Sequence, residues 1–163
     1  MTYRRFLAMI ATSTLIMYGL MYLNTYETGH IWMSETRAWM ALLMGAVMAL
    51  IMLGFMWSMY RNTGRNMAII GVAIATFAGS LWLVRSQETV GDMAYMEAMI
   101  PHHSIAILTS SRAHIKDPRV RELADGIIKA QVREIDEMKA LIYDIDAKGP
   151  RGTTDIPPRV PTS

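Results

Sequence analysis

Three long stretches without a charged residue most constrain how this chain can fold. They cover residues 6–23, 38–60 and 67–84. A helix that crosses a bilayer needs about 20 mainly apolar residues, with about 17 as the lower limit. The sequence therefore predicts three transmembrane helices and a membrane domain over residues 1–86. A cleaved signal peptide is the alternative for the first stretch, but that stretch ends in the bulky pair Tyr22 and Leu23 without a small-residue cleavage site.

The charges beside these stretches predict how the helices are oriented. Arg4 and Arg5 precede the first stretch, Arg61 and Arg65 separate the second from the third, and neither flank contains an acidic residue. Short basic segments favour the cytoplasmic side of a membrane. We therefore expect a protein of the bacterial inner membrane, with a cytoplasmic N-terminus and a periplasmic C-terminal domain.

Beyond the third stretch the sequence predicts two helices joined by a short link. The first runs from about Thr89 or Asp92 to His114, and the second starts at Asp117 and Pro118, an N-cap followed by proline. It continues to about Ala147, and the proline-rich residues 149–163 are expected to be a disordered tail. Apolar residues recur at helical spacing through Pro101, which indicates a kinked helix; the alternative is that one helix ends there.

The predicted fold class is therefore all-α, with three transmembrane helices followed by an antiparallel hairpin over residues 87–148. Two helices alone cannot bury two apolar faces. We expect homo-oligomerisation to complete a four-helix bundle.

Composition excludes several classes of function. The net charge of +2 and the lack of a basic helix argue against nucleic-acid binding. The absence of cysteine excludes disulfides and thiolate metal sites. We find no Ser-His-Asp order, glycine-rich phosphate loop or paired-carboxylate helix motif, so an enzyme is not expected.

Methionine is unusually abundant, with 16 residues in 163, and it occurs in two ordered sets. The first set repeats every four residues through the second apolar stretch: Met40, Met44, Met48, Met52 and Met56. Steps of four residues drift by about 40° on a helix, so this set winds around the helix and is expected to pack. An oligomeric copper-conducting channel is the alternative.

The second methionine set lies beside a histidine pair and predicts a metal site. Met96, Met99 and His103 share one helix face that begins at Asp92, and His102 lies at its edge. A hairpin that turns near Lys116 places Met99 opposite about Arg133 and brings Glu134 and Met138 to the same region. Thioether sulfur with imidazole suits Cu(I).

The predicted metal-binding residues are therefore Met96, Met99, His102, His103 and Met138, with Glu134 and Asp92 in supporting positions.

The same region resembles a known family. The run from Asp92 to His103, then Ala106 and Ile107, and a later segment with Gln131, Glu134, Ile135 and Met138 are similar to domain-of-unknown-function family 305 over about residues 88–146. The resemblance implies a ferritin-like helical fold and an association with copper binding and copper tolerance in the bacterial periplasm. It matches His102 and His103 to the family's histidine pair, and Met96, Met99 and Met138 to its methionine positions. Many members continue with methionine after Ile107, where this chain has Leu108.

These observations predict a membrane-anchored periplasmic protein that sequesters Cu(I) or hands it over in copper homeostasis. Its expected partners are the lipid bilayer, further copies of itself and a periplasmic copper donor or acceptor protein. The alternative is a structural or interaction protein whose methionines only pack.

Overall fold

The computed structural model describes residues 2–157, and every regular element in that range is helical. In chain order the elements are α1 (Tyr3–Leu20), the 3₁₀ turn η1 (Thr28–His30), α2 (Glu35–Phe55), the 3₁₀ turn η2 (Trp57–Met59), α3 (Thr63–Ser86), α4 (Asp92–Arg112) and α5 (Pro118–Lys148). The predicted all-α fold is confirmed for these residues. Within the predicted tail, residues 149–157 form neither helix nor strand, and residues 158–163 lie outside the described range.

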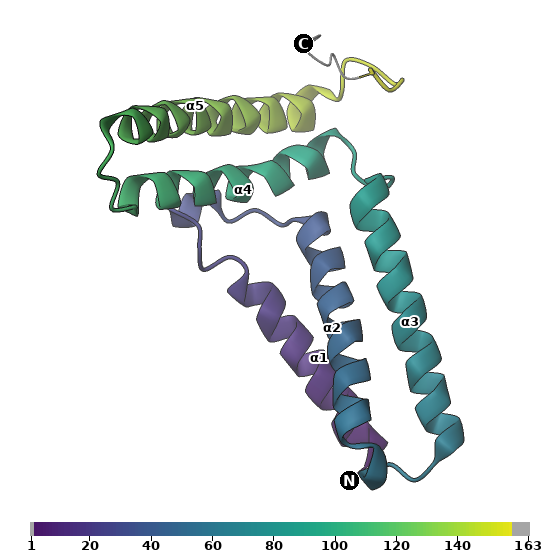
Figure 1. The fold of residues 1–163 in the computed structure, drawn as a ribbon. Coiled ribbons are helices and arrows are strands. Elements are labelled where there is room, and N and C mark those ends of the chain that lie inside the picture. Colours follow the sequence, from purple (N-terminus) through teal and green to yellow (C-terminus); the bar gives the residue numbers. More distant parts are fainter. Residues whose placement is uncertain (1, 158–163) are drawn as a thin grey trace.

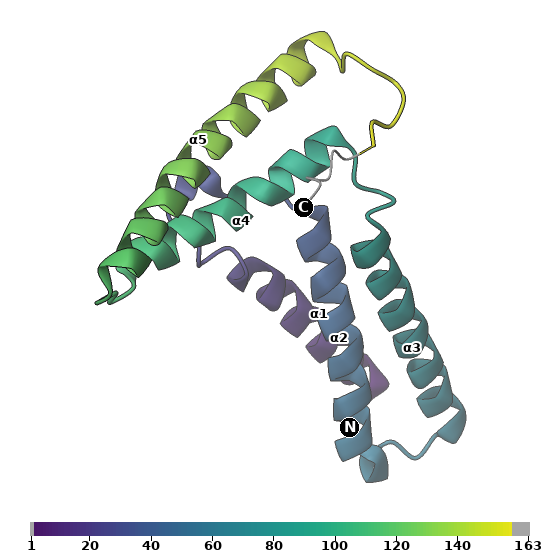
Figure 2. The same cartoon turned by 45° about the horizontal axis from the view of Figure 1, so that its top comes forward.

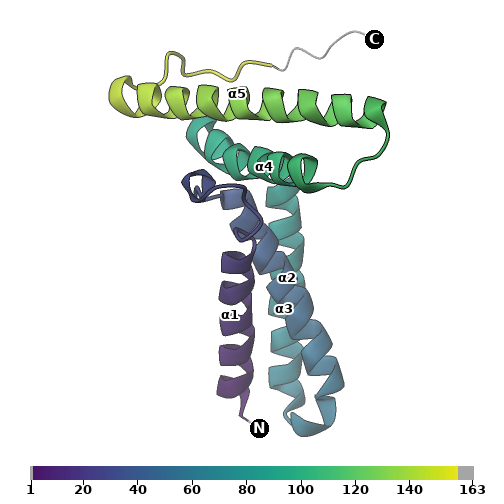
Figure 3. The ribbon, with the colours of Figure 1, turned by 90° about the vertical axis from the view of Figure 1, so that its left-hand side faces the viewer.

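Helices α1, α2 and α3 run up and down beside one another, and the α4–α5 hairpin lies across one end of them (Figures 1 and 3). The middle helix, α2, contacts both α1 and α3. Its small buried residues Ala46 and Ala49 pack with Phe6 of α1 and Ala73 of α3. Small side chains let helices approach closely, as is common inside membranes.

Two of the three predicted transmembrane segments, α2 and α3, are long and apolar enough to cross a membrane, and α1 is not. Helix α1 includes Arg4 and Arg5 and ends at Leu20, before the predicted end at Leu23. Its apolar part, residues 6–20, is about 22 Å long at 1.5 Å per residue. That length is short of the roughly 30 Å of bilayer hydrocarbon, so the structure supports two candidate membrane spans instead of the predicted three.

The boundaries of the two remaining segments differ modestly from the predicted ones. Helix α2 ends at Phe55, and η2 occupies the end of the predicted 38–60 segment. Met52 and Met56, two of the methionines that repeat every four residues, pack against the core of the three-helix layer.

The predicted hairpin forms, with α5 within one residue of its predicted end and α4 ending at Arg112, two residues before the predicted His114. The Asp117 carboxylate accepts a hydrogen bond from the Arg119 N–H (2.9 Å) at the start of α5, with Pro118 as its first residue. Helix α5 ends before Gly149, which has φ 77°, a conformation that glycine adopts without steric cost. Helix α4 continues through Pro101, so the helix does not end there.

The register of the hairpin differs from the prediction. His103 of α4 lies against Glu134 of α5, where a turn centred on Lys116 would have placed Lys129. This offset of five residues corresponds to about 7.5 Å along a helix. One turn further along each helix, it puts Met99 level with Met138, whereas the prediction put Met99 opposite Arg133.

Candidate functional site

The contact between His103 and Glu134 is the best-defined polar contact of the predicted site. The Nδ1 atom of His103 lies 2.9 Å from the carbonyl oxygen of Met99, one turn earlier on α4. Its Nε2 atom lies 3.0 Å from Oε2 of Glu134 on α5. The His103 side chain is 13% exposed and Glu134 is 37% exposed, so the pair is reachable from solvent at one edge of the hairpin.

These two contacts define what must lie between the side chains. A carbonyl oxygen only accepts hydrogen bonds, so Nδ1 carries the hydrogen that it donates to Met99. A neutral imidazole then has its lone pair on Nε2, and the ionised Glu134 oxygen beside it also only accepts. A single proton between Nε2 and Glu134, bonded to either group, satisfies this contact, and a metal ion in its place would be held by the same two atoms.

The supporting contact on His103 differs from the predicted one. We expected Glu134 to support the metal-binding residues, whereas the group that lies at Nδ1 of His103 is the Met99 backbone carbonyl. Glu134 instead faces Nε2, the nitrogen that would bind a metal. A carboxylate on that side favours a bound cation electrostatically.

The three predicted methionine ligands lie in different environments. Met96 is only 6% exposed and packs in the hairpin core with Ile100, Ile107, Ile135 and Ile142. Met138 packs partly against that core, and Met99 is half-buried on the same helix as His103. Met99 and Met138 are therefore the predicted methionines that lie about one helical turn from the His103–Glu134 contact.

The remaining predicted residues lie away from this contact. His102 is exposed, and its ring is perpendicular to that of His103 with the centroids 6.3 Å apart. Asp92 is exposed in the first turn of α4. It precedes His103 by 11 residues, or about 16 Å of helix, so Asp92 does not support that side chain directly.

A metal site at His103 would need ligands other than histidine and carboxylate. Among residues 2–157, no three His, Asp or Glu side chains come close enough together to hold a metal ion. A site at His103 and Glu134 therefore depends on thioether sulfur for its further ligands. Thioether sulfur together with an imidazole would suit a soft monovalent cation better than a hard divalent one.

A second polar cluster, not predicted from the sequence, lies where the link between α1 and α2 docks on α4. Turn η1 contacts α4 (Figure 1). The fully buried Ser104 hydroxyl accepts a hydrogen bond from the Tyr26 N–H (2.7 Å) and lies 3.0 Å from Nδ1 of His30. A buried polar group needs a hydrogen-bond partner. Ser104, a serine on the apolar face of α4, therefore indicates in the sequence that another segment packs against this face.

His30 is held in its neutral form by this docking. Burial lowers its pKa, and the Lys139 ammonium on α5 lowers it further, against the opposing effects of Glu27 and Asp136. The Nε2 atom of His30 lies 3.9 Å from Glu27.

Comparison with known proteins places the hairpin in a family. Residues 83–154 match the family described as Domain of unknown function (DUF305). The chain belongs to the DUF305 family. The matched residues include all of α4 and α5, and therefore every residue of the predicted metal site.

A viral protein is also similar to part of the chain. An uncharacterized protein of Acanthamoeba polyphaga mimivirus is 34% identical over an alignment of 104 positions, which covers 58% of this chain and 67% of the viral protein. No solved structure matches the chain.

Proposed function

We propose that this DUF305 protein is a membrane-anchored copper-binding protein that holds Cu(I) on the α4–α5 hairpin. The observation that supports it most directly is the His103–Glu134 contact, in which a single proton between Nε2 and the carboxyl group satisfies both side chains. Copper would take the place of that proton, with the thioethers of Met99 and Met138 as further ligands and Glu134 neutralising the charge. With no reacting group beside the ion, the role is sequestration or handover.

Membrane anchoring is supported by the surface of α2 and α3. Both helices are long and apolar enough to span a bilayer. Large apolar side chains on α3 remain exposed, including Val72 (68%) and Trp82 (59%). Water would disfavour such a surface, whereas lipid would not. The arginine-rich end would be cytoplasmic, which places the hairpin in the periplasm of a bacterial cell.

A second copy of the chain would cover the open face of the hairpin. Leu123 and Leu141 on α5 are 65% and 52% exposed, on the same side of the helix as Glu134. Two hairpins packed through this face would form a four-helix bundle with the metal residues beside the interface. A purely monomeric mass in detergent would count against this part of the proposal.

Copper competition tests the site. We expect the purified full-length protein in detergent to take Cu(I) from a chromophoric chelator. His103→Ala and the double variant Met99→Leu, Met138→Leu should bind much more weakly, and Glu134→Gln about 10–100-fold more weakly, the usual cost of losing a supporting group. His102→Ala, which changes the exposed neighbouring histidine, is the matched control.

Two results would contradict the metal site. One is equal Cu(I) affinity in wild type and His103→Ala. The other is no copper above background after loading, which would favour the rival proposal of a structural or interaction protein. The packing of Met52, Met56 and Met96 in the two cores supports that rival.

A further inference from the structure

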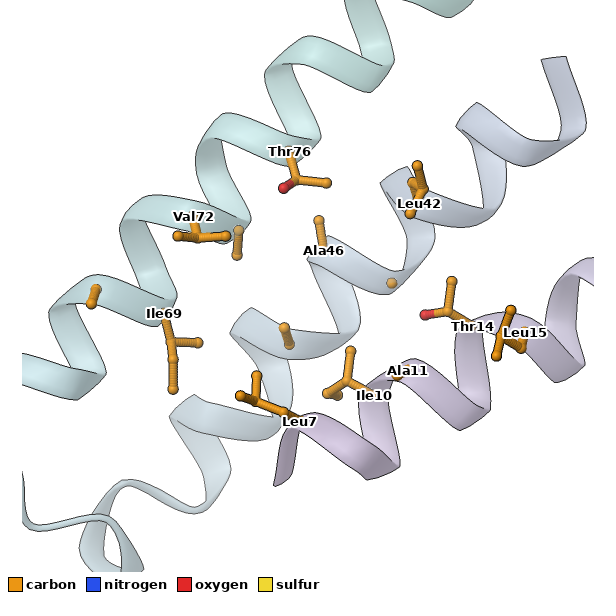
Figure 4. Close-up of a pocket in the computed structure, with 14 residues that line it drawn as sticks. Leu7, Ile10, Ala11, Thr14, Leu15, Leu42, Ala46, Ile69, Val72 and Thr76 are labelled. Carbon is orange, nitrogen blue, oxygen red and sulfur yellow. The ribbon is translucent and has the colours of Figure 1, made fainter. Parts of the chain in front are cut away.

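An apolar groove lies between α1 and α3, over the surface of α2 (Figure 4). Its volume is about 710 Å³, within the range of about 300–1,000 Å³ typical of small-molecule pockets. Helix α1 contributes Leu7 and Ile10, α2 contributes Ala46, and α3 contributes Ile69 and Val72. The small residues of α2 leave this space open, because longer side chains there would fill it.

One end of the groove carries a concentration of positive charge. The Tyr3 hydroxyl donates a hydrogen bond to Oδ1 of Asn66 (2.8 Å), which is almost completely buried. The same hydroxyl lies 3.2 Å from the Asn62 carbonyl oxygen. These contacts join the start of α1 to the α2–α3 link, so four exposed arginines gather at one end of the layer: Arg4, Arg5, Arg61 and Arg65.

No carboxylate neutralises this charge. The sequence has no acidic residue before Glu27 and none between Glu35 and Glu88. Within residues 2–157, none of these four arginines forms an ion pair. The groove begins at Leu7 and Ala68, each three residues after an arginine, a distance of about 4.5 Å along a helix.

A ligand that satisfies both features has an apolar chain that ends in an anionic group. We propose that the groove binds an acyl chain of an anionic phospholipid whose headgroup lies among Arg4, Arg5, Arg61 and Arg65. This inference rests on the membrane anchoring proposed above. Basic pockets between membrane helices on the cytoplasmic side are suited to anionic headgroups. A neighbouring protein helix would fill the groove without supplying that negative charge.

Native mass spectrometry of the full-length protein in detergent tests this site. The protein is incubated with phosphatidylglycerol or with phosphatidylcholine of identical acyl chains. We expect one phosphatidylglycerol per chain to be retained at least about fivefold more than phosphatidylcholine, and thermal stability to rise with phosphatidylglycerol only. Equal retention of the two lipids, or retention of neither, would overturn the proposal.

Two variants address the two halves of the site. Replacement of all four arginines by Gln should abolish the preference for phosphatidylglycerol, whereas Arg112→Gln on the hairpin should keep it. Val72→Trp should fill the groove and reduce retention of both lipids. Ile74→Trp is its matched control, because Ile74 is also exposed on α3 (54%) but does not line the groove. Equal loss of lipid in both Trp variants would show that the groove is not the site.

The failure of this inference is distinguishable from failure of membrane anchoring. If alkaline carbonate releases the protein from membranes, the anchoring proposal and the lipid site fail together. If the protein stays in the membrane but binds both lipids equally, only the lipid site fails. A second copy bound through the groove would appear as a dimer that Val72→Trp dissociates, and this result would also overturn the lipid proposal.

Discussion

Met96 and Met99 are three residues apart on α4, yet they have different surroundings. Met96 is buried among isoleucines, while Met99 is half-buried and supplies the carbonyl that orients His103. On a helix, three residues amount to a rotation of about 300°, which is enough to move a side chain from the centre of a helix interface to its edge. The two methionines are therefore expected to respond differently to substitution.

We predict that Met96→Ala lowers the free energy of unfolding of the hairpin by about 2–5 kcal/mol, as for other large-to-small core changes. Met96→Leu should cost less than about 1.5 kcal/mol, because it conserves volume, and should leave Cu(I) affinity unchanged. Denaturation in detergent followed by circular dichroism measures the first effect, and chelator competition the second. A large loss of copper affinity in Met96→Leu would instead make its sulfur a ligand.

The link between α1 and α2 joins the three-helix layer to the hairpin through a few polar contacts. The link ends in Trp32 and Ser34, and Trp32 packs against the hairpin core. The Ser34 N–H donates a hydrogen bond to the Tyr22 hydroxyl (3.0 Å), which closes the link on itself. Together with the Ser104 contacts, this arrangement makes the docking of the link depend on the protonation of His30.

We predict that acidification loosens this docking. The pKa of His30 is lowered in the folded protein, so protonated His30 is favoured in the undocked state. The stabilising contribution is complete above the ordinary histidine pKa of about 6.5, and it is lost as the pH falls from there towards the lowered value. Glu27, Asp136 and Lys139 face His30, and the two carboxylates oppose this effect.

Hydrogen–deuterium exchange of residues 24–34, corrected for intrinsic rates, measures this change between pH 7.5 and pH 5.5. His30→Gln cannot take up a proton and serves as the comparison. Protection that falls equally in wild type and His30→Gln would assign the pH effect to another group.

The crossing of α1 and α2 depends on Gly45. A Cβ at this position would collide with the Thr14 hydroxyl. We predict that Gly45→Ala costs about 1–3 kcal/mol through overpacking, measured by thermal unfolding in detergent. Thr14→Ala should recover most of that loss in the double variant, because it removes the colliding group. A double variant no more stable than Gly45→Ala would place the cause elsewhere.

At the scale of the whole molecule, the charges separate along the long axis of the three-helix layer. The arginine-rich end and the α4–α5 hairpin lie at opposite ends (Figures 1 and 2). Most of the carboxylates belong to the hairpin and to the link that docks on it. A membrane crossed by α2 and α3 would hold the hairpin flat on one surface.

We predict that, in intact cells, a labelling reagent added from outside reaches only the hairpin side of the protein. The chain has no cysteine, so a single introduced cysteine is the only thiol of the protein that a maleimide can label. Thr153→Cys should react with a membrane-impermeant maleimide in intact cells, and Thr63→Cys at the start of α3 should react only after the membrane is opened. The reverse pattern would invert the proposed orientation.

The sequence by itself determined the five helices, the hairpin and the candidate residues His103, Glu134, Met99 and Met138. These features depend on local periodicity, on caps such as Asp117 and Pro118, and on residue chemistry, all of which are readable along the chain. The predicted first segment is longer than α1, because the apolar stretch continues to Leu23 while the helix ends at Leu20.

Only the tertiary structure decided which of these residues meet. The register that pairs His103 with Glu134 depends on how two helices cross, and a five-residue error is invisible to periodicity. The burial of Met96, the exposure of His102 and the docking of His30 on Ser104 depend on contacts between distant segments. Such contacts are set by the packing of whole faces, which no single segment encodes.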